Sequence, residues 1–304
     1  MLLSSVGEQF LANLDILQQN MATTNAQLSS GYRISKPSDD PAAITDVLQL
    51  EFDGSRVAQT ISNLNAVQGE VNTAEGALQS ATSLLDQAQT LGVEGATSTQ
   101  TAAGRTTLAN QVSQILSQVV NISRTTFEGR YVFSGDDPRA PAYQVDPTSP
   151  TGVDQLQSAP STQLVEDSNG VSFAVSLTAG QIFDSSDSTG APTSNNVFAA
   201  LNSLSVALSN NDQPGITSAL SALTSAQNYF EGQLAFYGTV QGRITNSLNL
   251  AQQNQTQWTA ALGQLRDTDV AAAATQLTQD NLSQTAALQA EASLPHTSLF
   301  DYLK

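Results

Sequence analysis

Residues 57–88 read VAQTISNLNAVQGEVNTAEGALQSATSLLDQA, and this stretch decides the fold. An apolar residue recurs at every seventh position and a second set of small apolar residues accompanies it: Val57, Leu64, Val71, Leu78 and Leu85, with Val67, Ala74, Ala81 and Ala88. Such a heptad repeat turns one face of a helix toward a partner along its whole length. The stretch therefore predicts a long helix that packs against other long helices.

The beginning of the chain supplies a first partner helix. The stretch Leu3–Leu28 has the same four-and-three spacing of apolar residues. Gly31 is the expected C-cap of this helix. Asp40, as N-cap, and Pro41, at the first helical position, are expected to start the next helix, which should run to about Leu91.

The later part of the chain supplies further helices. Gly92, Gly95 and Gly104 predict a loop, followed by a third helix antiparallel to the second. The longest repeat starts at Ile216, and a weaker helix after Asp269 is expected to pair with the first. We call the apolar stripe along which such helices pack the seam. In the longest repeat, one of the two seam positions alternates between leucine and glutamine, and buried glutamines there are expected to fix the register of the helices. These residues are Leu220, Gln227, Leu234, Gln241, Leu248, Gln255 and Leu262.

The middle of the chain changes character at Gly129. Arg130–Gly135 predicts a strand that ends in a turn, and several prolines after it forbid long helices. Asn169 and Gly170 predict the tight turn of a β-hairpin. The expected fold is mainly α with a small β insertion: a long antiparallel coiled-coil rod built from both chain ends, with a β-rich domain in the middle of the sequence.

This organisation predicts three domains. Residues 1–40 and 268–304 form a terminal helical domain for assembly, residues 41–128 and 197–267 form the helical rod, and residues 129–196 form the inserted β-rich domain.

The terminal helices are too weakly apolar to bury much surface as an isolated pair. We therefore expect them to become ordered when they pack against neighbouring copies. The expected assembly contacts are the apolar residues of both ends: Phe10, Leu14, Leu17, Met21, Leu28, Leu277, Leu288, Leu299 and Phe300.

Composition excludes several classes of function. The net charge of −17 and the isoelectric point near 4.1 argue against nucleic acid or an anionic membrane as a partner. The chain has no cysteine, which excludes disulfides and thiolate metal sites. The start MLLSSVGEQFL lacks the pattern of a secretory signal, so the chain is expected to be cytoplasmic or to be exported without a cleaved signal.

The search for catalytic or metal-binding residues gives three weak candidates. His296 has no cysteine or second histidine with which to build a zinc site or a triad. The calcium-like run from Asp184 lacks the required glycine and glutamate. Asp39 and Asp40 could act as acid and base, but helix capping already explains them. We therefore expect no enzyme, no metal and no cofactor.

Two motifs resemble a known family. The segments Leu28-Ser-Ser-Gly-Tyr-Arg-Ile34 and Ser38-Asp-Asp-Pro-Ala42 resemble the N-terminal signature of bacterial flagellins and their relatives. Within that group, Gly129-Arg-Tyr-Val-Phe-Ser-Gly135 and the ending Ser298-Leu-Phe-Asp-Tyr-Leu303 resemble the hook-associated proteins of the hook–filament junction. Gly31, Arg33, Asp39, Asp40 and Pro41 are then expected to form a linker and cap between the terminal and rod helices.

The resemblance implies a structural role outside the cell. It implies an unfolded chain exported through the flagellar secretion channel, with an export chaperone at the C-terminal region. It also implies a ring of copies between the first hook-associated protein and flagellin. Two alternatives stay open: a flagellin filament subunit, and an acidic surface binding module or adhesin on a coiled-coil stalk.

Overall fold

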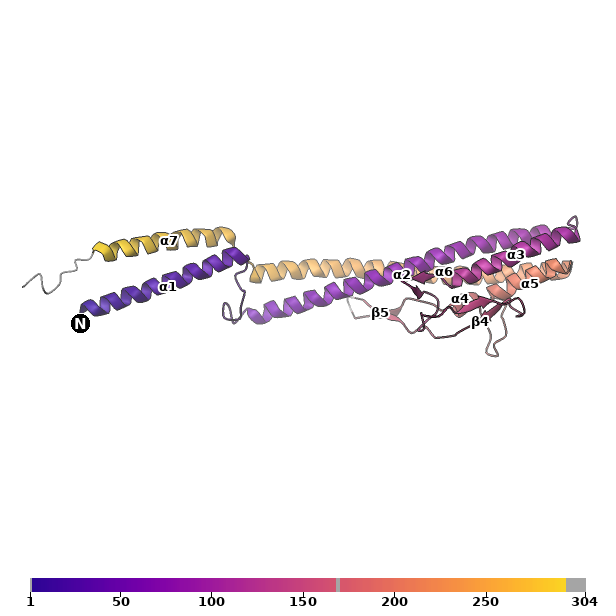
Figure 1. The fold of residues 1–304 in the computed structure, drawn as a ribbon, viewed down its shortest axis with the longest axis horizontal. Helices are drawn as coiled ribbons and strands as arrows, with labels where there is room; N and C mark the ends of the chain where they lie inside the picture. The colour runs from indigo at the N-terminus through magenta and orange to yellow at the C-terminus, as the bar shows by residue number, and fades with distance from the viewer. Residues whose placement is uncertain (1, 168–169, 294–304) are drawn as a thin grey trace, which may run out of the picture. The chain divides into compact units, whose positions relative to one another are not determined.

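The computed structural model describes residues 2–167 and 170–293. Within these ranges the chain is mainly helical, with short strands between the third and fifth helices (Figure 1). The helices are α1 (Leu2–Ser30), α2 (Ile44–Ala96), α3 (Ala102–Ser123), α4 (Ala179–Phe183), α5 (Val197–Ser209), α6 (Gln213–Arg266) and α7 (Val270–Ser293). The predicted fold class, mainly α with a β-rich insertion, is confirmed.

The chain divides into two compact units. The terminal unit combines the described residues up to Arg56 with those from Asn254 onward, and so contains α1, α7 and one end each of α2 and α6. The central unit runs from Val57 to Gln253.

The predicted heptad residues form the core of the central unit. From Leu64 to Ala88 every seam residue of α2 is buried. They belong to one apolar cluster with seam residues of α6, namely Ile216, Leu223, Phe230, Tyr237 and Ile244. Burying a leucine or phenylalanine side chain of this kind contributes about 1.5–3 kcal/mol, so the repeat supplies most of the apolar stabilisation of these helices.

The glutamine layers are only partly as predicted. Gln227 is buried and its side-chain amide donates to Asp86 of α2 at 3.0 Å. Gln241 is half-buried and donates to Asn72 at 2.8 Å, whereas Gln255 is exposed. Only the Gln227 layer, of these three, is therefore buried.

The predicted glycine loop is wrong. Gly92 and Gly95 lie inside α2 and Gly104 inside α3, and the connection between these helices covers residues 97–101. A Cβ on Gly92 would lie 2.6 Å from a methyl group of Leu220, and one on Gly95 would collide with Leu208. These two glycines permit close packing of α2 against other helices instead of a turn.

The start of α2 also differs from the prediction, since the helix begins at Ile44 and not at Pro41. Residues 41–43 form a turn that leads into it. The side chain of Asp40 accepts hydrogen bonds from the backbone of Ala42 at 3.2 Å and of Ala43 at 3.1 Å, as an N-cap does.

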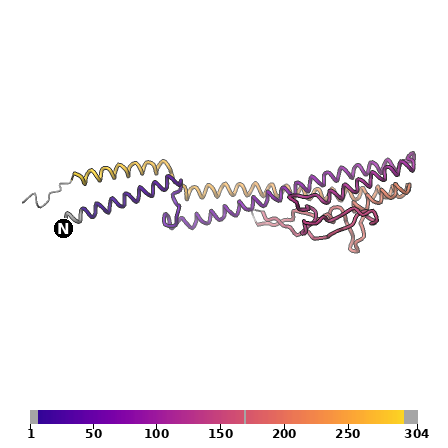
Figure 2. The backbone as a smooth tube through the Cα atoms, in the orientation of Figure 1, coloured from indigo at the N-terminus to yellow at the C-terminus, as the bar shows by residue number. Residues whose placement is uncertain are grey.

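The β insertion consists of three two-stranded antiparallel hairpins, which Figure 2 shows on one side of the helices of the central unit. Their strands are β1 (Thr126–Phe127) with β2 (Arg130–Tyr131), β3 (Tyr143–Val145) with β4 (Val153–Gln155), and β5 (Leu164–Glu166) with β6 (Ser172–Ala174). The predicted turn at Gly170 joins β5 and β6 with a φ of +80°, and Asn169 lies outside the described residues.

The predicted strand Arg130–Gly135 is reduced to the two residues of β2. Glu128 and Gly129 both have positive φ and form a tight turn that pairs β2 with β1. After Tyr131 the chain turns inward, and Val132 and Phe133 are buried in the core. Most of the predicted strand is therefore not a strand, and its apolar residues Val132 and Phe133 pack into the core instead.

The most extensive helical partner of the third helix, α3, is α5. The hydroxyl of Ser205 donates to the carbonyl of Ala109 at 3.0 Å across this interface. Arg105 at the start of α3 is buried and ties three segments together by donating to the carbonyls of Gly95 and Thr97 and to the side chain of Asn211.

Candidate assembly surface

The candidate site is the pair of terminal helices, together with the linker that follows α1. Within the terminal unit α1 and α7 lie side by side (Figure 1). Gly31, with φ +76°, ends α1 and donates its backbone N–H to the carbonyl of Gln27 at 2.9 Å. Asp269 caps α7, because its side chain accepts from the backbone of Ala271 and Ala272 at 3.0 Å.

The predicted assembly residues lie mostly on the seam of this pair. Six of them are half-buried: Phe10, Leu14, Leu17, Met21, Leu28 and Leu277. Among the described side chains of α1 and α7, only Thr24, Ala273 and Asp280 are fully buried. Leu288 is half exposed, while Leu299 and Phe300 lie outside the described residues. The pair thus buries no large apolar side chain completely.

A second set of apolar residues, which the sequence analysis missed, points to solvent. Leu11 is 63% exposed, Ile16 56% and Leu282 71%. These residues do not fall on the seam positions of the repeat. An apolar residue outside the seam was therefore the feature of the sequence that could have revealed them. Leucine or isoleucine side chains are thus exposed on both helices of the pair.

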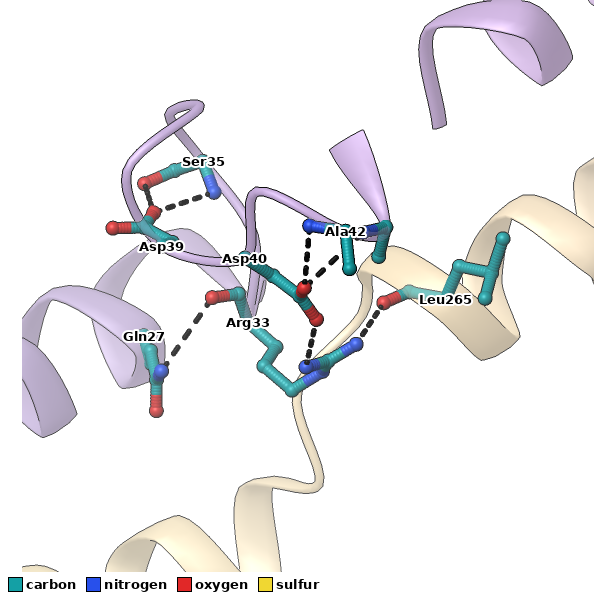
Figure 3. Close-up of polar contacts among 8 residues, drawn as sticks. Gln27, Arg33, Ser35, Asp39, Asp40, Ala42 and Leu265 are labelled. Atoms are coloured by element: carbon teal, nitrogen blue, oxygen red, sulfur yellow. Dashed lines mark hydrogen bonds and ion pairs between the residues drawn. The ribbon is translucent and has the colours of Figure 1, made fainter. Parts of the chain in front are cut away.

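The linker folds around Arg33, as Figure 3 shows. Its guanidinium lies 3.1 Å from the Asp40 carboxylate and donates to the carbonyl of Leu265 at 2.8 Å. Its backbone N–H donates to the carbonyl of Arg266 at 2.6 Å. Arg33 therefore joins the linker to the last turn of α6, where free carbonyls and the helix dipole favour a cation.

Asp39 and Asp40 stabilise the two turns of the linker. Asp39 accepts from the backbone of Ser35 at 2.9 Å (Figure 3). It also accepts from the backbone of Lys36 at 3.0 Å. The Ser35 backbone hydrogen bond is the main reason why the pKa of Asp39 is lowered. The pKa of Asp40 is lowered by the backbone hydrogen bond from Ala43 and then by Arg33. Both carboxylates are thus fixed as acceptors, while Pro41 is exposed.

Arg266 completes the linker and was not found from the sequence. Its guanidinium lies 3.1 Å from Glu51 and 3.5 Å from Asp267, and stacks 4.0 Å above the ring of Tyr32. Basic residues are rare in this chain, which has only ten lysine and arginine residues, and this rarity was the feature of the sequence that could have drawn attention to Arg266. Arg33 thus joins the linker to the end of α6, and Arg266 of α6 contacts Tyr32 of the linker and Glu51 of α2.

The other candidates give no catalytic centre. Among residues 2–167 and 170–293, no group of three histidine or acidic side chains is placed to hold a metal ion. The carboxylate of Asp184 accepts from Tyr143 at 2.8 Å and from Asn196 at 2.6 Å, which gives it a structural role in its loop. His296 lies outside the described residues. No helix in the described ranges is long and apolar enough to cross a membrane.

Comparison with known proteins confirms the family resemblance. Residues 6–137 match the family model of the bacterial flagellin N-terminal helical region. Flagellin B of Helicobacter pylori is 31% identical over 118 residues, which span 38% of this chain and 23% of that protein. The flagellin of Bacillus subtilis is 26% identical over 288 residues, spanning 89% of this chain and 86% of the relative.

Solved structures show the same fold. A protein described as a flagellar hook-associated protein from Vibrio parahaemolyticus matches with a TM-score of 0.65 and 20% identity, covering 75% of this chain and all of that one. Hook-associated protein 3 of Legionella pneumophila matches with a TM-score of 0.61 and 12% identity, covering 72% and 98%. The matched family and structures are those of flagellar structural proteins, not of enzymes.

Proposed function

We propose, from the flagellin N-terminal helical region that this chain carries at residues 6–137, that it is the adaptor subunit joining hook to filament in a bacterial flagellum. Copies of it form a ring between the first hook-associated protein and flagellin. The subunit acts outside the cell and is exported through the flagellar channel without a cleaved signal, with an export chaperone bound at its C-terminal region.

The observation that carries this proposal is the incomplete burial of α1 and α7. Among the side chains of α1 and α7 that the structure describes, no large apolar one is completely buried, and Leu11, Ile16 and Leu282 face solvent. A leucine that is moved from water into a packed interface contributes about 1.5–3 kcal/mol. The pair therefore gains most of its stability from contact with neighbouring subunits.

We assign the chain's parts accordingly. Residues 1–40 and 268–304 form the assembly domain, in which the seam residues shape the helix pair and the outward residues contact neighbours. Residues 41–128 and 197–267 form the helical rod, and residues 129–196 the β-rich insertion. Arg33, Asp39 and Asp40 fix the linker between the assembly domain and the rod.

Deletion of residues 1–28 tests the mechanism. The truncated chain should keep the folded central unit, which near-ultraviolet circular dichroism checks, but should fail to restore swimming to a strain that lacks this gene. A sharper variant is the pair Leu11→Asp and Leu282→Asp, which leaves the seam in place. Its matched control is Leu164→Asp in the β5 strand, where the side chain is 61% exposed. Swimming restored by the truncated chain would contradict the proposal.

A flagellin filament subunit is the second candidate. The alignment with the Bacillus subtilis flagellin, which spans most of both chains, favours it. The matches to hook-associated protein structures favour the adaptor. Complementation separates the two: an adaptor restores filaments to a strain without its junction protein, and a filament subunit restores them to a strain without flagellin.

A surface binding module on a helical stalk is a third reading. Deleting residues 136–190 separates it from the adaptor, because an adaptor retains assembly without the insertion while a binding module loses its ligand.

A further inference from the structure

The β insertion contains a polar cleft that assembly of the terminal helices does not use. It lies within the central unit, between the segment after β4, the short helix α4 and residue Tyr229 of α6, and has a volume of about 510 Å³. We call it the insertion cleft. A second hollow of about 490 Å³ shares Gln155 and Asp184 with it. This size is in the range of small-molecule sites.

The walls of the insertion cleft are held in place by the chain itself. The side-chain amide of Gln157 lies 3.1–3.3 Å from the carbonyl oxygens of Ser134, Asp137 and Ala140. Gly135, with φ +61°, lets the segment at Pro160 approach so closely that a Cβ would lie 2.5 Å from its carbonyl oxygen. The cleft is therefore preformed, which lowers the entropic cost of binding.

Two hydrogen-bonding side chains in the lining are fixed by a shared network. The hydroxyl of Tyr143 donates to Asp184 at 2.8 Å and accepts from the Gln155 amide at 3.1 Å. The pKa of Tyr143 is raised, mainly because the side chain is buried. Its phenol therefore stays protonated and keeps donating to Asp184. A carboxylate offers about four lone-pair sites, so Asp184 retains capacity to accept further hydrogen bonds.

A buried hydroxyl marks the same place. Ser134 lines the insertion cleft and is 2% exposed, and its side-chain oxygen has no hydrogen-bond partner among the described residues. A buried hydroxyl without a hydrogen-bond partner destabilises the folded chain. A rotation of this side chain would offer the hydroxyl to a polar group in the cleft.

Tyr229 adds an aromatic surface to the lining. It is half-buried, and its hydroxyl donates to the carbonyl of Gln181 at 2.8 Å, which fixes the ring. No lysine, arginine or histidine is among the described residues that line the cleft, so an anion would find no cation there. Asp184 is the one carboxylate among the described lining residues, and its two oxygens already accept from Tyr143 and Asn196.

We propose that the insertion cleft binds a neutral sugar ring, with Gln155 and Asp184 hydrogen-bonding its hydroxyls and Tyr229 packing against its C–H face. Carboxylate, carboxamide and hydroxyl groups beside one aromatic ring suit a ligand that is polar at its edge and apolar on its face. The ligand is either a free sugar or a glycan on another macromolecule.

Saturation-transfer NMR on the full chain tests this with the methyl glycosides of glucose, galactose, mannose and N-acetylglucosamine, each at about 10 mM, where millimolar binding is detectable. At least one glycoside should show transfer, and Tyr229→Ala should weaken its binding at least about tenfold. Tyr229→Phe keeps the ring and should retain binding. Gln155→Ala should weaken it, whereas Gln118→Ala on α3, outside the cleft, should not.

A second arm presents the same sugars on albumin. Binding in both arms supports a glycan on a macromolecule, and binding of the glycosides alone supports a free sugar. The proposal is overturned if the folded chain binds none of the four sugars, or if Tyr229→Ala binds as tightly as the parent chain.

Discussion

The terminal helices and the central helices have the same heptad repeat of apolar residues, but these residues are buried to different degrees. In α2 the seam residues from Leu64 to Ala88 are buried against a second long helix. In α1 the equivalent seam residues, such as Leu14 and Leu17, stay half-buried with only α7 beside them. The same repeat thus forms a closed apolar core in the central unit and a partly exposed seam in the terminal unit.

The reason is the number of neighbours. In the central unit the seam of α2 packs in one apolar cluster with residues of α6, α3 and α5 and with aromatic residues of the insertion, including Phe133 and Phe183. Among the described residues of the terminal unit, the α1 and α7 pair has no comparable cover. Seam residues such as Leu14 and Leu17 therefore stay partly exposed.

The largest expected effect comes from removing one leucine in each region. Leu78→Ala should destabilise the central unit by about 3 kcal/mol, because it leaves a cavity in a closed core. The matched change Leu14→Ala should cost the isolated subunit less than about 1 kcal/mol, since that site is half open. Native-state hydrogen exchange on the full chain measures both, by following residues 64–88 and 7–28 separately. Equal losses of stability in the two variants would contradict the difference in burial between the α2 seam and the α1 seam.

A smaller effect, with opposite signs, is expected from two glycines of α2. Gly95→Ala should destabilise the central unit by about 1–3 kcal/mol, because its new methyl group meets Leu208. Gly76→Ala, where nothing lies within 4 Å, should stabilise the helix by about 0.5–1 kcal/mol. Urea unfolding followed by circular dichroism measures both. A stabilising Gly95→Ala would mean that helix packing there is looser than the structure has it.

The smallest effect is expected in the linker of the terminal unit, and it depends on pH. The pKa of Asp40 is lowered by the Ala43 backbone and by Arg33, so its folded-state pKa lies below that of the unfolded chain. Its stabilising contribution is therefore present above the unfolded pKa of about 3.9 and is lost as the pH falls through the folded pKa.

Hydrogen exchange of residues 33–47 between pH 6 and pH 2.5 would detect this loss, after correction for the intrinsic pH dependence of exchange. Asp40→Asn should exchange faster at pH 6 and should show a weaker dependence on pH. Arg139→Ala, which removes an exposed arginine of the central unit, is the control. An unchanged pH dependence in Asp40→Asn would show that another carboxylate governs this segment.

Local patterns were enough to predict much of this fold. The heptad spacing from Val57 to Ala88 predicted the burial of α2, and Gly31 predicted where the first helix ends. Asp40 was predicted to start the second helix with Pro41 at its first position, and the helix instead begins at Ile44. These features depend on side-chain periodicity and on backbone hydrogen bonds between near neighbours, which a sequence displays directly.

Contacts between distant residues could not be predicted in this way. Gly92 and Gly95 looked like loop residues because their role depends on Leu220 and Leu208, more than a hundred positions later. The same holds for Arg33 and the carbonyl of Leu265, and for the insertion cleft, whose lining comes from β4, α4 and α6.

The sequence by itself determined the helical repeats, their caps, the position of the β insertion and the family resemblance. Only the tertiary structure decided which apolar residues close a core and which stay open, since burial depends on how many elements surround a helix. For this reason it was the structure that separated the seam residues of α1 from the outward-facing Leu11 and Ile16.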